Sequence, residues 1–222
     1  MSRAESTSSH LVLLLGVGLT ALLLGLIWFS RGIKDIQAPP GMPLSQDMAA
    51  TLLTEPMTLP DFHLTDTKGE PFNKLALKDT WSFLFFGYTY CPDICPTTLA
   101  LLGEVENLLR KSDLAVNRQY VFISVDPDRD TPDRLGEYLA FFNPLFIGAT
   151  GAEREIQTLT KPLGIRYQRS PEERPMGDYL IDHSATILLT NPDGQLQALI
   201  SPPHDAAVIA GDLQRIIVSV SD

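Results

Sequence analysis

Nineteen consecutive residues near the N-terminus carry no charge. They run from Leu11 to Phe29 with the sequence LVLLLGVGLTALLLGLIWF. As a helix this run would extend roughly 28 Å, close to the roughly 30 Å hydrocarbon core of a bilayer. Cleaved signal peptides have shorter apolar regions followed by a small-residue cleavage site, whereas this run ends in Trp28 and Phe29 before the basic Arg31. The sequence therefore predicts an uncleaved transmembrane anchor behind a short tail, residues 1–10.

Charge separates this anchor from the rest of the chain. The chain has 17 Lys+Arg and 27 Asp+Glu, and its first 34 residues hold three of the basic residues and one of the acidic ones. The remainder therefore carries a formal net charge of −12. Nucleic acids and anionic headgroups select clustered basic residues, which argues against nucleic acid as a partner. Basic residues flank both ends of the anchor (Arg3 before it, Arg31 and Lys34 after it), so they leave its orientation open.

Residues 30–56 are interpreted as a linker. They contain scattered Pro, Gly and Met without a sustained period, and at most one short helical turn is expected. A flexible chain of about 25 residues spans roughly 25 to 30 Å, enough for a tethered domain to search the membrane surface. Met42, Met48 and Met57 are candidate soft ligands, but unpatterned methionines are more often filler.

Residues 57–222 alternate between strand and helix patterns and predict an α/β domain. The apolar runs Trp81–Tyr88 and Tyr120–Val125 are typical of strands buried on both faces. Strand–helix alternation in the middle implies parallel crossovers, and Asn191–Gly194 joins an antiparallel pair, so we expect a mixed sheet flanked by helices. The other expected strands are a hairpin at 62–72 and segments at 145–147, 179–182, 185–190 and 195–200; the expected helices are 99–109, 132–142 (Thr131 as N-cap), 152–163 and 205–220.

The two cysteines lie four residues apart in Tyr88-Thr-Tyr-Cys91-Pro-Asp-Ile-Cys95-Pro96, between a buried strand and a helix. Pro96 suits a first helical position, where free N–H groups and the helix dipole favour thiolates. The spacing brings the cysteines within about 6 Å, compatible with a disulfide or with two ligands on one ion. Two thiolates select Cu(I) or Zn(II), and a third ligand is needed.

Histidine can supply that third ligand. His183 lies in Asp182-His183-Ser184, directly before an apolar strand, and in a thioredoxin-like topology this loop packs against the cysteine motif. His10 borders the anchor, and we expect exposed or helix-start polar roles for His63 and His204.

Several charged side chains near the cysteines are left outside the ligand set. Asp126, Asp128, Arg129 and Asp130 follow a strand's carboxyl end, where they either support the site or position a partner, or serve as ordinary capping and turn residues. Asp93 is expected to cap or tune the loop.

Four segments together resemble the Sco/SenC family of copper proteins: YTYCPDICP (88–96), SVDPDRDTP (124–132), DYLIDHS (178–184) and NPDG (191–194). They occur in this order behind one predicted transmembrane helix, and the resemblance covers about residues 57–222. It implies a thioredoxin-like fold and a copper site made of Cys91, Cys95 and His183. It also implies a role in assembling the CuA centre of cytochrome c oxidase subunit II.

Two functions stay open. The first is a metallochaperone, not an enzyme, that carries a copper ion. The second is a thiol-disulfide reductant that uses Cys91 and Cys95 alone to keep the acceptor's cysteines reduced. The dithiol machinery of thioredoxins is altered, because the spacing is CxxxC and Ala185 stands where their cis-proline would fall. A purely structural disulfide is disfavoured because so small a loop removes little unfolded-state entropy.

The expected location is the bacterial inner membrane, with one span and the domain in the periplasm. Soft-metal handling and a disulfide-capable pair suit an oxidising space, and the N-terminus lacks an Arg-rich presequence. Oxidation of the pair would block metal binding, so a thiol reductant is an expected partner. A periplasmic copper donor is expected as well, because a carrier must be loaded.

Overall fold

The computed structural model describes residues 48–112, 114, 116–170 and 179–221. The predicted tail, the predicted anchor at 11–29 and the linker up to residue 47 lie outside these residues. Among the described residues, no helix combines the length and apolar character needed to cross a membrane.

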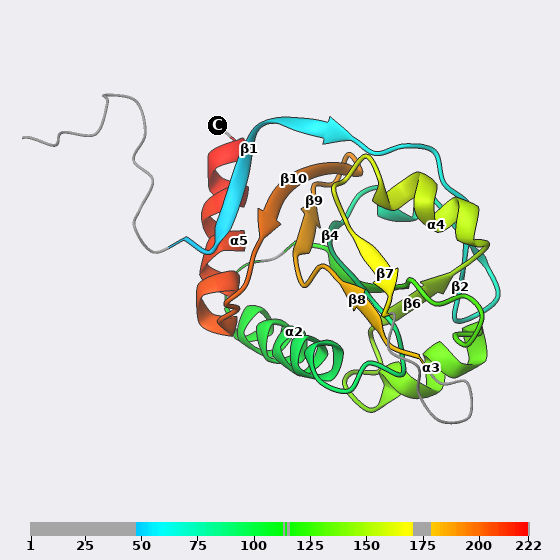
Figure 1. Cartoon of the computed structure of the whole chain (residues 1–222). Coiled ribbons are helices and arrows are strands. Elements are labelled where there is room, and N and C mark those ends of the chain that lie inside the picture. Colours follow the sequence, from blue (N-terminus) through cyan, green and yellow to red (C-terminus); the bar gives the residue numbers. More distant parts are fainter. Residues whose placement is uncertain (1–47, 113, 115, 171–178, 222) are drawn as a thin grey trace, which may run out of the picture. The chain divides into compact units, whose positions relative to one another are not determined.

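A mixed sheet of eight strands forms the centre of the described unit (Figure 1). Its strand order is β1-β10-β9-β4-β5-β6-β2-β3, with β4, β5 and β6 parallel and β9, β10 and β1 antiparallel to their neighbours. The strands are β1 (Ala50–Thr58), β2 (Leu64–Asp66), β3 (Pro71–Phe72), β4 (Trp81–Gly87), β5 (Arg118–Ser124), β6 (Ile147–Thr150), β9 (Ile187–Thr190) and β10 (Gln195–Ile200). A separate two-stranded sheet pairs β7 (Tyr167–Arg169) with β8 (Ile181–His183).

Helices cover this sheet, as the sequence predicts for strands without polar alternation. All seven residues of β4 are buried, which requires cover on both of its faces. Helix α2 packs against α5, and α3 packs against β6. The helices are α2 (Ile94–Lys111), α3 (Pro132–Ala140), α4 (Glu153–Thr160), α5 (Ala206–Ser221) and the short 3₁₀ helix η1 (Lys74–Leu77). The expected mixed α/β fold with a central sheet is confirmed.

Strand register brings four loops to one edge of the sheet. Gly87 at the end of β4 lies opposite Ser124 at the end of β5. Phe85 lies opposite Ile187, and Ile187 in turn lies opposite Ile200. The segments 88–93, 125–131, 184–186 and 201–205 therefore leave or enter the sheet at the same edge. In α/β proteins this carboxyl-terminal edge of the parallel strands is where sites form.

The expected linker boundary at residue 56 is wrong. Residues 50–58 form the edge strand β1, which pairs with β10 at residues 50–52, bulges, and pairs again from Met57. The Ala50 N–H donates to the buried Asp212 carboxylate of α5 at 2.8 Å. The bulge and the exposed face remove the alternation that marks a strand, so the sequence pattern reads as a linker.

Smaller differences also have local causes. The strand expected at 145–147 lies at 147–150, and β7 is absent from the predicted elements because two of its three residues are exposed. Helix α2 begins at Ile94, so Pro96 is not its first residue. Thr131 does cap α3, with its hydroxyl accepting the Arg134 N–H at 3.3 Å. Of the candidate methionines, Met48 packs against the core, Met57 lies in β1, and Met42 is outside the described residues.

Removing residues 1–56 should destabilise the domain, whereas removing residues 1–47 should not. The longer deletion takes away most of β1 and its bond to Asp212, at about 1 kcal/mol for each net backbone hydrogen bond. We expect a loss of roughly 2 to 4 kcal/mol in the free energy of unfolding, measured by urea titration. Equal stability of the two truncated proteins would contradict this prediction and support a domain that begins at residue 57.

Candidate metal centre

The two cysteines meet where β4 passes into α2. The Cys91 N–H donates to the Tyr88 carbonyl at 3.2 Å, which turns the chain back toward the sheet. The Cys95 N–H, in the first turn of α2, lies 3.4 Å from Cys91 Sγ. Cys91 is 9% exposed and Cys95 is fully buried, so Cys91 is the more accessible of the two residues.

His183, the last residue of β8, brings its imidazole to this pair. Its Nε2 lies 3.8 Å from Cys91 Sγ and 3.2 Å from Cys95 Sγ. The three ligand atoms all lie within 4.8 Å of one another. The imidazole also packs edge-on against the Tyr88 ring, with 5.8 Å between the centroids. The structure therefore brings together the three residues singled out from the sequence.

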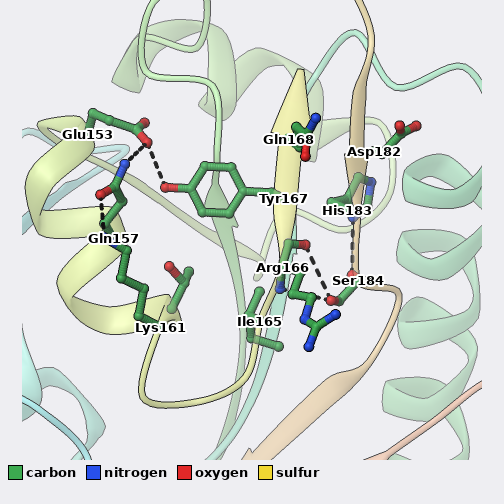
Figure 2. A pocket seen from close by; sticks show the side chains of 11 residues that line it. Glu153, Gln157, Lys161, Ile165, Arg166, Tyr167, Gln168, Asp182, His183 and Ser184 are labelled. Carbon is green, nitrogen blue, oxygen red and sulfur yellow. Dashed lines mark hydrogen bonds between the residues drawn. The ribbon is translucent and has the colours of Figure 1, made fainter. Parts of the chain in front are cut away.

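A backbone carbonyl sets the tautomer of His183, that is, which ring nitrogen carries the hydrogen and which one offers a lone pair to the sulfurs. His183 Nδ1 lies 3.1 Å from the Ser184 carbonyl oxygen, which can only accept, so Nδ1 carries the hydrogen. Ser184 is itself held, because its N–H donates to the Arg166 carbonyl at 2.9 Å and its hydroxyl accepts the Arg166 N–H at 3.0 Å (Figure 2). Nε2 is then free to act as a ligand, the usual arrangement of metal-binding histidines.

The two thiols differ in acidity. The hydrogen bond from the Cys95 thiol is the main reason that the pKa of Cys91 falls to about 4; burial opposes this, and the backbone N–H groups of Asp93 and Cys95 add to the lowering. Burial raises the pKa of Cys95, and the neighbouring Cys91 sulfur raises it further. The expectation that the helix start lowers both pKa values is thus wrong for Cys95 in the metal-free protein. Complete burial outweighs the helix terminus there.

This donor set fits a soft cation. Two sulfurs and one imidazole nitrogen are the ligands preferred by Cu(I) and Zn(II), and neither cysteine is in a disulfide. Three donors leave room for an incoming ligand, as sites that exchange their metal require.

A pocket of about 720 Å³ beside His183 lies between α4 and the β7–β8 pair, and Figure 2 shows the residues that line it.

Of the described residues, the other two histidines, His63 and His204, and also Asp93 lie outside this group. His63 is exposed, with Nδ1 3.6 Å from the Glu155 carboxylate. His204 donates from Nε2 to the Ala185 carbonyl at 2.9 Å, before α5. His10 is outside the described residues. Asp93 stands at the N-cap of α2 but its side chain makes no capping hydrogen bond, so the capping expectation is wrong, and it is the Asp93 N–H that approaches Cys91.

Asp130 supports the cysteine loop through hydrogen bonds to Thr89. Its buried carboxylate accepts the Thr89 N–H at 2.9 Å, the Thr89 hydroxyl at 2.6 Å and the Ser124 hydroxyl at 2.7 Å. Burial raises the pKa of Asp130. Of the two interpretations left open for the 126–130 segment, this favours support of the site. Thr89 was not predicted as part of the site. The sequence feature that could have indicated it is a hydroxyl residue directly after the apolar run of β4.

The known proteins that are similar to this chain include copper-binding ones. The model of the family described as SCO1/SenC matches residues 51–218. A putative copper-binding protein of Stutzerimonas stutzeri is 37% identical over 77% of this chain and 80% of its own length. Mitochondrial protein SCO2 of Saccharomyces cerevisiae is 42% identical over 65% of this chain, but the match spans about half of that relative, 48%. The crystal structure of yeast Sco1 with copper bound superimposes with a TM-score of 0.68 at 34% identity, covering 74% of this chain and 90% of that one.

Gly87→Ala should displace Cys95. A Cβ at position 87 would lie 2.5 Å from Cys95 Sγ and 2.8 Å from the Phe122 ring. We expect a loss of about 1 to 3 kcal/mol in unfolding free energy, typical of overpacking, together with weaker metal binding. Gly103→Ala in α2 is the matched control, because its nearest new contact is 3.8 Å away. Wild-type metal affinity in Gly87→Ala would show that Cys95 does not depend on this contact.

Alkylation should distinguish the two thiols in the reduced, metal-free protein. Because the pKa of Cys91 is lowered to about 4, its thiolate persists as the pH falls from 8 to 5. The iodoacetamide rate at Cys91 should change little over this interval, whereas an ordinary thiol loses about three orders of magnitude in thiolate. Cys95 should react only after unfolding. Peptide mass spectrometry locates the adduct, and a tenfold fall in the Cys91 rate per pH unit would contradict the assignment.

Proposed function

The chain belongs to the SCO1/SenC family, and from this premise we propose that it is a metallochaperone that carries a copper ion on Cys91, Cys95 and His183. The observation that carries the proposal is the convergence of two sulfurs and one correctly oriented imidazole nitrogen within 4.8 Å. The S. stutzeri relative is described as a putative copper-binding protein, and yeast Sco1 has been crystallised with copper bound. Both relatives support copper as the cargo.

The acidity difference between the thiols suits loading and release of this cargo. Cys91 offers a thiolate at neutral pH and is the more accessible sulfur, so it is the first protein ligand. Cys95 must lose its proton to become a ligand, which makes occupancy of the complete site depend on pH. With three protein ligands, an acceptor's Cys or His can enter the remaining position and displace them in turn.

We further propose the CuA centre of cytochrome c oxidase subunit II as the acceptor, in line with the family resemblance. The carrier has no enzymatic turnover of its own. It is held by a single span at residues 11–29 in the bacterial inner membrane, with the copper domain in the periplasm. There a copper donor loads the site and a thiol reductant keeps its cysteines reduced, because a disulfide cannot bind the metal.

A specific observation also favours the reductant function. Cys91 is a low-pKa thiolate beside a buried partner thiol, the arrangement used in thiol-disulfide exchange. In that reaction the Cys91 thiolate attacks an acceptor disulfide and one acceptor thiolate leaves. Cys95 then loses its proton and attacks the mixed disulfide, which releases the second acceptor thiolate. The Cys91–Cys95 disulfide that forms needs the external thiol reductant for regeneration.

His183→Ala separates the two functions. A carrier should lose at least tenfold in copper affinity, because one of three ligands is removed, and should lose oxidase assembly while disulfide exchange persists. Copper affinity, reduction of a model disulfide and CuA absorbance of the assembled oxidase are the measurements. The exposed His63→Ala is the control.

Two outcomes would decide against the carrier. One is loss of copper binding in His183→Ala with normal oxidase assembly. The other is loss of assembly in Cys91→Ser and Cys95→Ser but not in His183→Ala, which would establish the reductant function instead.

A further inference from the structure

Arginine and tyrosine side chains form a continuous cluster of contacts beside the metal centre. Arg129 Cζ lies 3.6 Å from the ring centroid of Tyr179 and 4.5 Å from that of Tyr90. Arg134 Cζ lies 4.2 Å from the Tyr90 centroid, and Arg169 Cζ lies 4.2 Å from the Tyr179 centroid. All four distances are within the range of cation–π attraction. We refer to these five residues as the arginine–tyrosine cluster.

Arg129 is the central member and the best fixed. Its side chain is 16% exposed, and its Nε donates to Asp126 Oδ2 at 2.5 Å. Asp126 is buried, and its other oxygen accepts the Tyr179 hydroxyl at 2.6 Å. Arg129 and Tyr179 are therefore held by the same carboxylate, that of Asp126, which lies in the loop between β5 and α3. The guanidinium has a defined place from which to contact the rings around it.

The cluster joins the two segments that carry the metal ligands. Tyr90 directly precedes Cys91, and Tyr179 lies four residues before His183. These segments are not neighbours in one sheet, because β8, which ends at His183, pairs with β7 and not with β4. A guanidinium that contacts both tyrosines therefore links the sulfur side of the site to its imidazole side.

A direct hydrogen bond also connects the segment before Cys91 to β8. The Ile181 N–H of β8 donates to the Tyr88 hydroxyl at 3.1 Å, and the Tyr88 ring lies 5.6 Å from Arg129 Cζ. The guanidinium therefore also contacts the residue that receives this bond.

We propose that Arg129 is a positioning residue of the metal centre: by contacting Tyr90 and Tyr179 together, it sets the approach of His183 to the cysteine pair. The inference deepens the proposed carrier function, and its affinity measurement rests on that function. Arg169 provides a comparison within the same cluster. Its guanidinium contacts Tyr179, whereas no contact with Tyr90 is found among the described residues. The Arg169 side chain is 57% exposed and forms an ion pair with Asp128.

The first test needs no copper. Hydrogen exchange in the reduced, metal-free full chain should be at least tenfold faster at the Ile181 and Cys91 amides in Arg129→Ala than in wild type. Amides of β10, remote from the cluster, should be unchanged. Arg169→Ala should leave all of these rates within twofold. A general loss of stability would instead accelerate β10 as well.

The second test measures copper on the same variants. Removing a group that orients a ligand typically costs 10- to 100-fold in metal affinity, and we expect a loss in that range for Arg129→Ala. The absorption and EPR spectra of its copper form should shift toward those of His183→Ala. Arg169→Ala should bind with nearly wild-type affinity and spectra.

Tyr179 gives an independent pair of variants in case Arg129→Ala does not fold. Tyr179→Phe keeps the ring under Arg129 and should retain most of the affinity, whereas Tyr179→Leu removes the ring and should behave like Arg129→Ala. The proposal is overturned if exchange at Ile181 and Cys91 is unchanged in Arg129→Ala, or if Arg169→Ala has an equal effect. It is also overturned if Tyr179→Leu matches Tyr179→Phe. Absence of copper binding by wild type would refute the carrier function alone, because the exchange measurement would still decide the role of Arg129.

Discussion

The sulfur of Cys95 lies against the backbone of Gly87, and this contact joins the core of the domain to its metal centre. Only a residue without a side chain at the end of β4 lets the first turn of α2 approach so closely. The approach buries Cys95 completely, whereas Cys91 keeps 9% exposure. Burial raises the pKa of the Cys95 thiol, and the hydrogen bond that this thiol donates lowers the pKa of Cys91. The chemistry of the pair is thus a consequence of how the helix packs on the sheet.

Two buried acidic side chains, Asp126 and Asp130, hold the loops around the site in place. Asp130 accepts three hydrogen bonds from Thr89 and Ser124, while Asp126 accepts from Arg129 and Tyr179. Isolated buried carboxylates are costly, but each of these is satisfied by donors from the segments that converge on the site. Two of the acidic residues that give the chain its negative charge are therefore buried and stabilise loops of the domain. Asp130 holds the cysteine loop through Thr89, and Asp126 holds the segment before β8 through Tyr179.

Much of this fold can be read from the sequence, and the exceptions have identifiable causes. β4 and β5 are long apolar runs and α3 carries a Thr-Pro start, so their types were predictable. β1 was not, because its bulge and exposed residues hide the period of a strand. The metal group was predicted from the family resemblance at Cys91, Cys95 and His183. Their unequal acidity was not, because a helix-start argument treats both sulfurs alike and burial is a property of the packed structure.

The orientation of His183 has a consequence for how the site tolerates sequence change. The group that receives its Nδ1–H is the carbonyl of Ser184, part of the main chain. A carbonyl of the backbone is present whatever side chain position 184 carries, and it does not titrate between pH 4 and 10. Sequence drift around the site can therefore alter the neighbours of the imidazole while its proton arrangement is inherited from the path of the chain. The tautomer of His183 is therefore set by the main chain, whichever side chain occupies position 184.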